Sequence, residues 1–458
     1  MKRPGNLLFI FADQMRAMDM NCAGNAEVCT PNLDRLANQG LRMTNAVAST
    51  PVCTPNRATL LTSTYPTTNT VLGNDVPLPS NLPSLGTVAQ SNGYRTGYIG
   101  KWHLDGMPRD KFTAPGPRRF GWEYWAAFNC SHDYFHPRYF LDTPKLHEPA
   151  GYEPTVQTDL AINFLNDQVN AGQPFCLVLS WGPPHDPYDQ VPAEYRRIYK
   201  PEELTLRPNV QPNSLNPLAQ GLDCRRTTAD YYAAITALDH ELGRLLDALD
   251  EFGFTPDTLV VFTSDHGDML WSHGLMKKQT PYAEAIEIPF LARYPGRIAA
   301  GQVNDTLFST VDVMPTVSGW LTWEVPAACE GRDIFNAIDA QTTQSVLIAN
   351  HCRYDEAVTQ NIPEWRGVRT SRYTYAETVN RRPWLFFDNK SDPYQLRNLV
   401  DDEGQLAVKQ ELQRMLDAWL TRLKDPFLPT DLMMDRYGLR KYWRKRQLQM
   451  HPTEGELP

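Results

Sequence analysis

The feature that most constrains the fold is an unbroken apolar run near the start of the chain, residues 7–12 (LLFIFA), which follows Asn6 and stops abruptly at Asp13. A strand that is apolar at every position is typical of a parallel sheet covered by helices on both faces. Similar runs follow at Phe175–Ser180 and Leu259–Thr263, and helical patterns separate them, the longest from Ala229 to Phe252. We therefore expect an α/β fold with a large, mostly parallel sheet sandwiched by helices, and ligands at the carboxyl ends of the strands.

The pattern changes near residue 340. Beyond it come short β-like runs and then a helical stretch from Gly404 to Leu423; the runs are Ser345–Ala349, Gly367–Thr370, Tyr373–Glu377 and Trp384–Asp388. This predicts a smaller C-terminal α+β domain with a short antiparallel sheet, a helix and a basic tail at residues 341–458. Residues 1–340 would then form the catalytic domain, and 458 residues suffice for both.

The basic tail, Arg436–Arg446, interleaves cations with Tyr442 and Trp443. It could be a solvated helix face, a subunit contact in a homo-oligomer, or a guide for acidic substrates. Nucleic-acid binding is disfavoured because the chain carries 44 basic and 53 acidic residues, a net charge of −9.

The cellular compartment is predicted from the lack of recognisable membrane, leader and disulfide patterns in the sequence. No apolar run approaches about 18 residues, so we expect no membrane span. The apolar run after Met1-Lys2-Arg3 is too short for a secretory leader. Eight cysteines show no CxxC spacing, which favours reduced thiols. We expect a cytoplasmic protein, or a periplasmic one if a leader preceded this sequence.

The strongest local signal is Cys53-Thr-Pro-Asn-Arg57. The proline favours a helix start, which would place both side chains near the positive end of the helix. That position lowers the pKa of a thiol and suits either a reactive cysteine or an anion site. The alternative is a buried structural thiol beside a surface arginine.

Other polar clusters follow predicted strands and should meet at the same sheet edge. Their carboxylates and amide oxygens suit a hard divalent cation, their cations suit an oxyanion, and their imidazoles suit proton transfer. They comprise Asp13, Gln14, Lys101, Trp102, His103, His185, Asp265, His266 and Lys278.

At these residues the chain resembles a type I, formylglycine-dependent sulfatase of the alkaline-phosphatase superfamily. The resemblance runs from Leu7 to about Asp401. It rests on the ordered segments FIFADQMR, TPNLDRLANQG, CTPNRATLLT, GYIGKWHL, PPHDPY, SDHGDMLWSHGL and KKQTPYAEAIEIPFLARYPG.

The resemblance implies that a formylglycine-generating enzyme oxidises Cys53 to formylglycine, whose hydrate attacks the sulfur of a sulfate ester. A covalent sulfated intermediate would form and then release sulfate. The implied catalytic residues are Cys53, Arg57 (nucleophile stabilisation), Lys101 (bridging nucleophile and sulfate), His103 (removing the second hydroxyl proton), and His185 and Lys278 (holding sulfate and protonating the leaving oxygen). The implied ligands of calcium, with magnesium as an alternative, are Asp13, Gln14, residue 53, Asp265 and His266.

Two departures from the family pattern bear on this site. Many members carry Asp-Asp and Asp-Asn where this chain has Asp13-Gln14 and Asp265-His266, which leaves two carboxylates rather than three. Ser63 stands where a glycine is common. Of two adjacent lysines, Lys278 is favoured over Lys277 because it stands two residues before Thr280.

The substrate is less defined. The aromatic segment Phe120–Phe140 is either a wall that stacks on a sugar or a hydrophobic plug on the sheet. His132, Asp133 and Trp102 are the candidate substrate contacts. Without a leader, a sulfated mono- or oligosaccharide cut in exo fashion is favoured. The alternatives are a phosphodiesterase or phosphonate monoester hydrolase of the same superfamily, and a non-catalytic anion-binding protein whose Cys53 stays a thiol.

Overall fold

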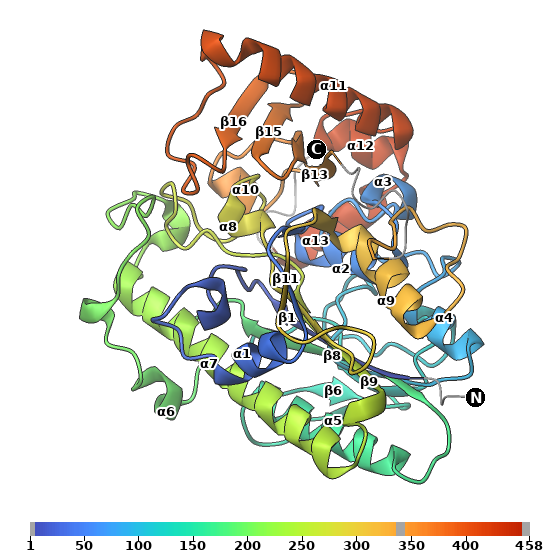
Figure 1. Ribbon diagram of the computed structural model, residues 1–458. Helices are drawn as coiled ribbons and strands as arrows, with labels where there is room; N and C mark the ends of the chain where they lie inside the picture. The colour runs from blue at the N-terminus through green and yellow to red at the C-terminus, as the bar shows by residue number, and fades with distance from the viewer. Residues whose placement is uncertain (1–4, 336–343, 451–458) are drawn as a thin grey trace.

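A computed structural model describes residues 5–335 and 344–450 of the chain. Its central sheet has the strand order β11-β2-β10-β9-β1-β8-β4-β5-β6-β7, and the run β9-β1-β8-β4-β5 is parallel throughout. Figure 1 shows this sheet with helices on both sides of β1, β8 and β9. The strands are β1 (Asn6–Asp13), β2 (Leu41–Met43), β4 (Arg95–Lys101), β5 (Tyr124–Phe128), β6 (Tyr139–Phe140), β7 (Leu146–His147), β8 (Phe175–Pro184), β9 (Thr258–Ser264), β10 (Phe290–Arg293) and β11 (Gln302–Asn304).

Strand β1 shows why the sheet is buried on both faces. Leu7, Phe9 and Phe11 pack in one hydrophobic core, while Leu8 and Ile10 pack in another. The first core also contains helices α2 (Cys53–Thr62), α4 (Leu85–Ser91) and α9 (Val313–Leu321), and the second contains α1 (Pro31–Asn38), α5 (Glu153–Gln168) and α7 (Cys224–Glu251). Because strand side chains alternate between faces, a sheet covered on both sides needs an apolar residue at every position.

The C-terminal part forms a second, antiparallel sheet. Its order is β13 (Val346–Asn350), β14 (Trp365–Arg369), β15 (Tyr373–Thr378) and β16 (Pro383–Asp388), and helix α11 (Leu406–Arg422) packs on it (Figure 1). The predicted fold class is confirmed. The predicted domain boundary, between residues 340 and 341, lies outside the described residues and stays a prediction.

Two helices at the end of the chain return to the large sheet. These are α12 (Thr430–Arg436) and α13 (Arg440–Met450). Met433, Met434 and Leu439 join the same hydrophobic core as Leu7. The basic tail therefore lies against the N-terminal part of the protein, which matters for the inference drawn below.

Short elements complete the chain. They are α3 (Pro66–Asn69), α6 (Ala193–Arg196), α8 (Ala283–Ile286), α10 (Glu356–Thr359) and a small parallel pair, β3 (Ala46–Val47) with β12 (Phe308–Ser309). Across residues 5–335 and 344–450, no helix combines the length and apolar character needed to cross a bilayer.

Candidate active site

The predicted site residues gather at one edge of the large sheet, where parallel strands end. Asp13 and Lys101 are the last residues of β1 and β4, and Asp265 directly follows β9. His185 directly follows β8, and Cys53 is the first residue of α2. The fold therefore brings together side chains that are up to 252 positions apart in the sequence, as the carboxyl edge of an open α/β sheet typically does.

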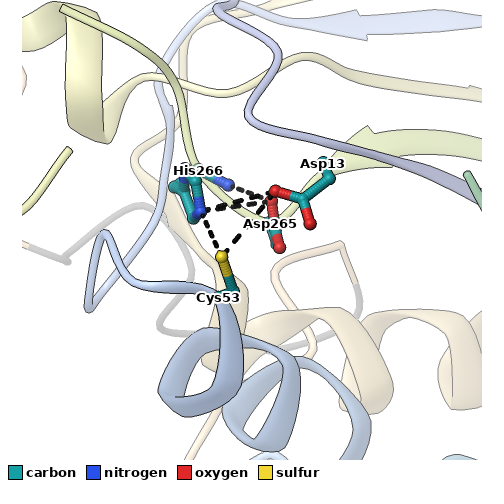
Figure 2. Close-up of side chains that lie close together, drawn as sticks. All are labelled: Asp13, Cys53, Asp265 and His266. Atoms are coloured by element: carbon teal, nitrogen blue, oxygen red, sulfur yellow. Dashed lines mark hydrogen bonds and ion pairs between the residues drawn. The ribbon is translucent and has the colours of Figure 1, made fainter. Parts of the chain in front are cut away.

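Four of these residues form a compact, buried cluster. Ligand atoms of Asp13, Cys53, Asp265 and His266 all lie within 4.8 Å of one another (Figure 2). His266 Nε2 is 3.2 Å from Cys53 Sγ and 3.7 Å from an oxygen of each carboxylate. The cluster is the best candidate for a metal centre among the described residues.

The orientation of His266 supports metal binding. Its Nδ1 lies 2.9 Å from the carbonyl oxygen of Gly267, to which it donates. The proton on Nδ1 leaves the Nε2 lone pair facing Cys53, Asp13 and Asp265. A metal-bound histidine is usually held in this way by a hydrogen bond from its other nitrogen.

Gln14 lies at the border of this cluster. Its backbone is in the left-handed region, with φ of 70°. Its Oε1 accepts a hydrogen bond from Lys278 Nζ at 2.8 Å, and its Nε2 donates to Asp268 Oδ2 at 2.6 Å. The amide oxygen thus points into the site, but towards the lysine.

Arg57 forms the floor of the site and is fully buried. It donates to Asp13 Oδ2 and Asp265 Oδ2, both at 2.9 Å. Its Nη1 also donates to the carbonyl oxygen of Lys101 and to Ser180 Oγ, at 3.0 and 2.8 Å. Two of these four hydrogen bonds orient the two carboxylates, and a buried arginine between them offsets their repulsion.

Lys278 lies beside Cys53, and His185 lies beside Lys278. Lys278 Nζ is 3.2 Å from Cys53 Sγ and 2.8 Å from His185 Nε2. His185 Nδ1 lies 2.8 Å from the carbonyl oxygen of Asp186, so Nε2 is the acceptor for the lysine. Burial and then the charge of Lys278 lower the pKa of His185 to about 4.

Lys101 and His132 complete this side of the site. Lys101 Nζ binds Asp13 Oδ2 and lies 3.2 Å from His132 Nε2. The His132 ring stacks on that of His185, with 4.2 Å between centroids. His132, predicted as a substrate contact, therefore stands beside the groups that surround the cysteine.

The charges around Cys53 favour an anion. Burial raises the pKa of its thiol, but Lys278, Lys101 and His266 outweigh burial and hold the pKa well below its ordinary value. Burial also raises the pKa of Asp13, yet Lys101 and the other cations hold it low. Because a cation site and an anion site share this space, the arrangement can bind a metal and an oxyanion side by side.

His103 approaches the cysteine from another direction. Its Nε2 lies 3.1 Å from Asp75 Oδ1, while its Nδ1 has no hydrogen-bond partner among the described residues. Burial lowers the pKa of His103, but the neighbouring Cys130 and Asp75 raise it to about 10. Asp75 was not predicted from the sequence. It follows Gly73-Asn74 in a loop, and no motif marks it.

Two predicted substrate contacts lie away from this cluster. Trp102 is fully buried, and its ring packs against Tyr98 and Trp125, with centroids 4.9 and 5.2 Å away. Asp133 pairs with the exposed His136, whose Nδ1 is 2.9 Å from Asp133 Oδ1. Most of the aromatic segment is thus a hydrophobic layer on β5, and its exposed members are few.

Comparison with known proteins agrees with this geometry. Residues 5–323 match the Sulfatase family, and residues 271–422 match the family described as N-sulphoglucosamine sulphohydrolase, C-terminal. An ulvan-active sulfatase of Formosa agariphila is 37% identical over 94% of this chain and 84% of its own. An endo-4-O-sulfatase of Bacteroides thetaiotaomicron is 29% identical over 94% of both chains.

A solved structure from Bacteroides thetaiotaomicron, described under the metabolism of multiple glycosaminoglycans, superposes with a TM-score of 0.83. It is 27% identical and covers 95% of this chain and 99% of its own. The matches span both the large sheet and the C-terminal sheet, and the segments carrying Cys53 and Lys278 lie inside the matched ranges. The chain belongs to the sulfatase family, and it is a sulfuric ester hydrolase with an alkaline-phosphatase-like fold.

Proposed function

We propose that this sulfatase hydrolyses a sulfate monoester on a saccharide, acting in exo fashion on a mono- or oligosaccharide. The single observation that carries the proposal is the surroundings of Cys53 Sγ, where Lys278 and His266 each lie 3.2 Å away. In the mature enzyme, a formylglycine-generating enzyme converts Cys53 to formylglycine, and the aldehyde adds water to give a hydrate, one hydroxyl of which is the attacking group. The cysteine sulfur stands in for that group.

The cations of the site would bind and polarise the sulfate. Lys278 and Lys101 both lower the pKa of Cys53, so their positive charges act on the position where the sulfate sulfur is attacked. Charge that develops on the sulfate oxygens is stabilised by these fixed cations. Arg57 acts from below by holding Asp13 and Asp265 in place.

Two histidines would move protons. His185, hydrogen-bonded to Lys278, would lie beside the leaving oxygen and share with this lysine the delivery of its proton. His103 lies next to residue 53, and its Nδ1 has no hydrogen-bond partner among the residues that the structure describes. The Cys53 thiol is one of the groups that raise the pKa of His103, and it is absent once residue 53 is formylglycine. In the mature enzyme His103 would accept the proton of the second hydroxyl when sulfate is expelled.

The metal proposed for this site is calcium, with magnesium as the alternative. Asp13, Asp265, His266 and residue 53 would hold it, with the amide oxygen of Gln14 close by. The two carboxylates are the ligands that these hard cations prefer, and the orientation of His266 Nε2 fits a further ligand. The cation would supply a fixed positive charge beside the nucleophile.

The substrate class rests on the relatives. One is named for activity on ulvan and another as an endo-4-O-sulfatase. His132 and Phe135, the latter 42% exposed, are candidate sugar contacts on the segment that borders the site, and we retain Asp133 as a third. Trp102 directly follows β4 and is buried, so it would contribute to substrate binding only by supporting this segment.

The alternative activity, hydrolysis of a phosphodiester or phosphonate monoester, has the same charge requirement as a sulfate ester. The cations of the site therefore do not separate the two. The relatives with 37% and 29% identity are both sulfatases, which favours the sulfate ester.

The test combines chemistry and modification. The protein is co-expressed with a formylglycine-generating enzyme, the mass at residue 53 is measured, and initial rates are compared on an aryl sulfate and a bis-aryl phosphate. We expect a formylglycine mass and faster sulfate release, which Cys53→Ala abolishes. A faster rate on the phosphate would overturn the proposal, and the size distribution of products from a sulfated oligosaccharide separates exo from endo action.

A further inference from the structure

The C-terminal helix α13 sends one arginine into the protein, next to the active site. Arg446 is 1% exposed, whereas its neighbours Arg444 and Lys445 on the same helix are exposed. Its Nε donates to Asp75 Oδ2 at 2.9 Å, and its Nη1 donates to Asp355 Oδ1 at 2.9 Å. A buried cation requires such paired partners, so the contacts are specific to this position.

Asp75 connects this arginine to His103. Oδ1 of Asp75 accepts from His103 Nε2 at 3.1 Å and from Arg109 Nε at 2.9 Å. Oδ2 accepts from Arg109 Nη2 at 2.8 Å and from Arg446 Nε. The carboxylate is therefore held by donors on both oxygens, and its plane is set.

The loop that carries Asp75 is also tied to the helix that carries the cysteine. Thr54 N donates to Asn74 Oδ1 at 3.0 Å, and Asp75 N donates to Thr54 Oγ1 at 3.2 Å. Thr54 is the residue next to Cys53. Asp75 consequently has a fixed place relative to residue 53, and only its side chain needs orienting.

We infer that Arg446 is a positioning residue of the sulfatase reaction: through Asp75 it orients the imidazole of His103, so that the C-terminal helix completes the active site. The inference rests on the proposed function, in which His103 accepts a proton. His103 Nε2 lies against Asp75, which fixes the ring so that Nδ1 is the nitrogen left to exchange a proton with residue 53. Without Arg446, one of the two donors on Asp75 Oδ2 is lost.

A residue that only stabilises the fold would behave differently from a positioning residue. Its substitution changes the melting temperature, but every folded molecule keeps its turnover rate. A substrate-binding cation changes KM. A residue that orients a proton acceptor changes kcat with little change in KM, because the substrate is bound as before.

The experiment compares Arg446→Met with Arg444→Met in the full-length protein. Both variants remove one positive charge from α13, but Arg444 is exposed and two residues away. Melting temperature and formylglycine content are measured first, then kcat and KM on an aryl sulfate. We expect Arg446→Met to lower kcat about 10- to 100-fold at similar KM, because small misplacements of catalytic groups cost this much. Arg444→Met should match the wild type.

A double-mutant cycle with Asp75→Asn tests the route. If Arg446 acts through Asp75, Arg446→Met causes little further loss of kcat in the Asp75→Asn background. Additive losses would overturn the inference, as would full kcat in folded Arg446→Met. If the methionine variant does not fold, Arg446→Lys replaces it. The lysine keeps the charge but cannot reach both Asp75 and Asp355, so we expect a kcat between those of the wild type and the methionine variant. A wild-type kcat in Arg446→Lys would overturn the inference.

The two proposals fail in distinguishable ways. A wild-type protein that carries formylglycine but releases no sulfate would overturn the proposed function and this inference with it. An active wild type with an unaffected Arg446→Met would overturn this inference alone.

Discussion

Lys278 places its ammonium nitrogen 3.2 Å from the sulfur of Cys53. The preceding residue, Lys277, points elsewhere, with its Nζ 3.2 Å from Asp186 Oδ2. The backbone explains the separation, since Lys277 has a φ of 61°. A left-handed residue turns the chain sharply, and two neighbouring lysines consequently serve different partners.

The first prediction concerns these two lysines. Lys278→Met should lower kcat/KM on an aryl sulfate by about 10²- to 10³-fold, because a fixed donor to the reacting anion is lost. Lys277→Met, which makes the same change in charge one residue away, should lose far less. Initial rates of both variants, corrected for formylglycine content, check this. Equal losses would contradict the assignment of Lys278.

The second prediction concerns the metal. His266→Ala should weaken metal binding by about 10- to 100-fold or more. Loss of a residue that only orients a metal ligand already lowers the affinity for the metal by about this factor, and His266 is proposed as a ligand itself. Metal content of the purified variant, measured by mass spectrometry, checks this directly. His240→Ala, an exposed histidine on α7, is the control. A wild-type metal content in His266→Ala would remove His266 from the ligand set.

A chelator extends this prediction to the identity of the cation. Treatment of the wild type with EDTA should abolish sulfate release, and added calcium should restore it. Restoration by magnesium alone would favour the alternative cation.

The sequence predicts those strands and helices whose formation depends on the pattern of apolar residues within the segment itself. Strand β1 is recognisable because each of its side chains meets one of two cores. Helix α7 is recognisable from its apolar spacing, although it begins at Cys224, before the apolar pattern, where Asp223 accepts a hydrogen bond from Arg226 N. Such capping depends on one side chain and leaves only a weak signal.

The site is predictable where a family motif carries it and not where distant segments meet. Cys53, Lys278 and His266 stand in recognisable segments. Asp75 and Arg446 come together across 371 positions of the chain, and neither lies in a motif. Trp102 shows the opposite case: it stands inside a motif, between Lys101 and His103, but its ring turns into the aromatic core.

The third prediction concerns pH and stability. His351 is buried near Asp425, and burial together with Arg366 lowers its pKa from 6.5 to about 4. Between these two pKa values the unfolded chain binds a proton that the folded protein does not. The free energy of unfolding should therefore fall as pH falls from about 6.5 towards 4, by up to about 3 kcal/mol.

Urea unfolding of wild type and His351→Asn between pH 7.5 and 4.5 checks this. The asparagine variant should show a shallower loss of stability on acidification, and His240→Asn, at an exposed position, should keep the wild-type slope. If His351→Asn loses stability as steeply as the wild type, another group is responsible.

The fourth prediction concerns Ser63, which ends α2 in the left-handed region with a φ of 55°. Its Oγ donates to the carbonyl oxygen of Val311 at 2.6 Å. Ser63→Gly should relieve a backbone cost of about 1 kcal/mol and lose the hydrogen bond to Val311, worth about 1 kcal/mol, together with a longer one accepted from Gly331 N at 3.3 Å, so its stability should fall less than that of Ser63→Ala. Ser63→Ala keeps the backbone cost and loses the hydrogen bond, which should lower the free energy of unfolding by about 1 to 2 kcal/mol. Because Ser63 lies at the opposite end of α2 from Cys53, kcat should be unchanged in both variants. Urea unfolding measures the two stabilities, and aryl sulfate kinetics measure kcat. An equal loss of stability in both variants would show that the hydrogen bond alone matters.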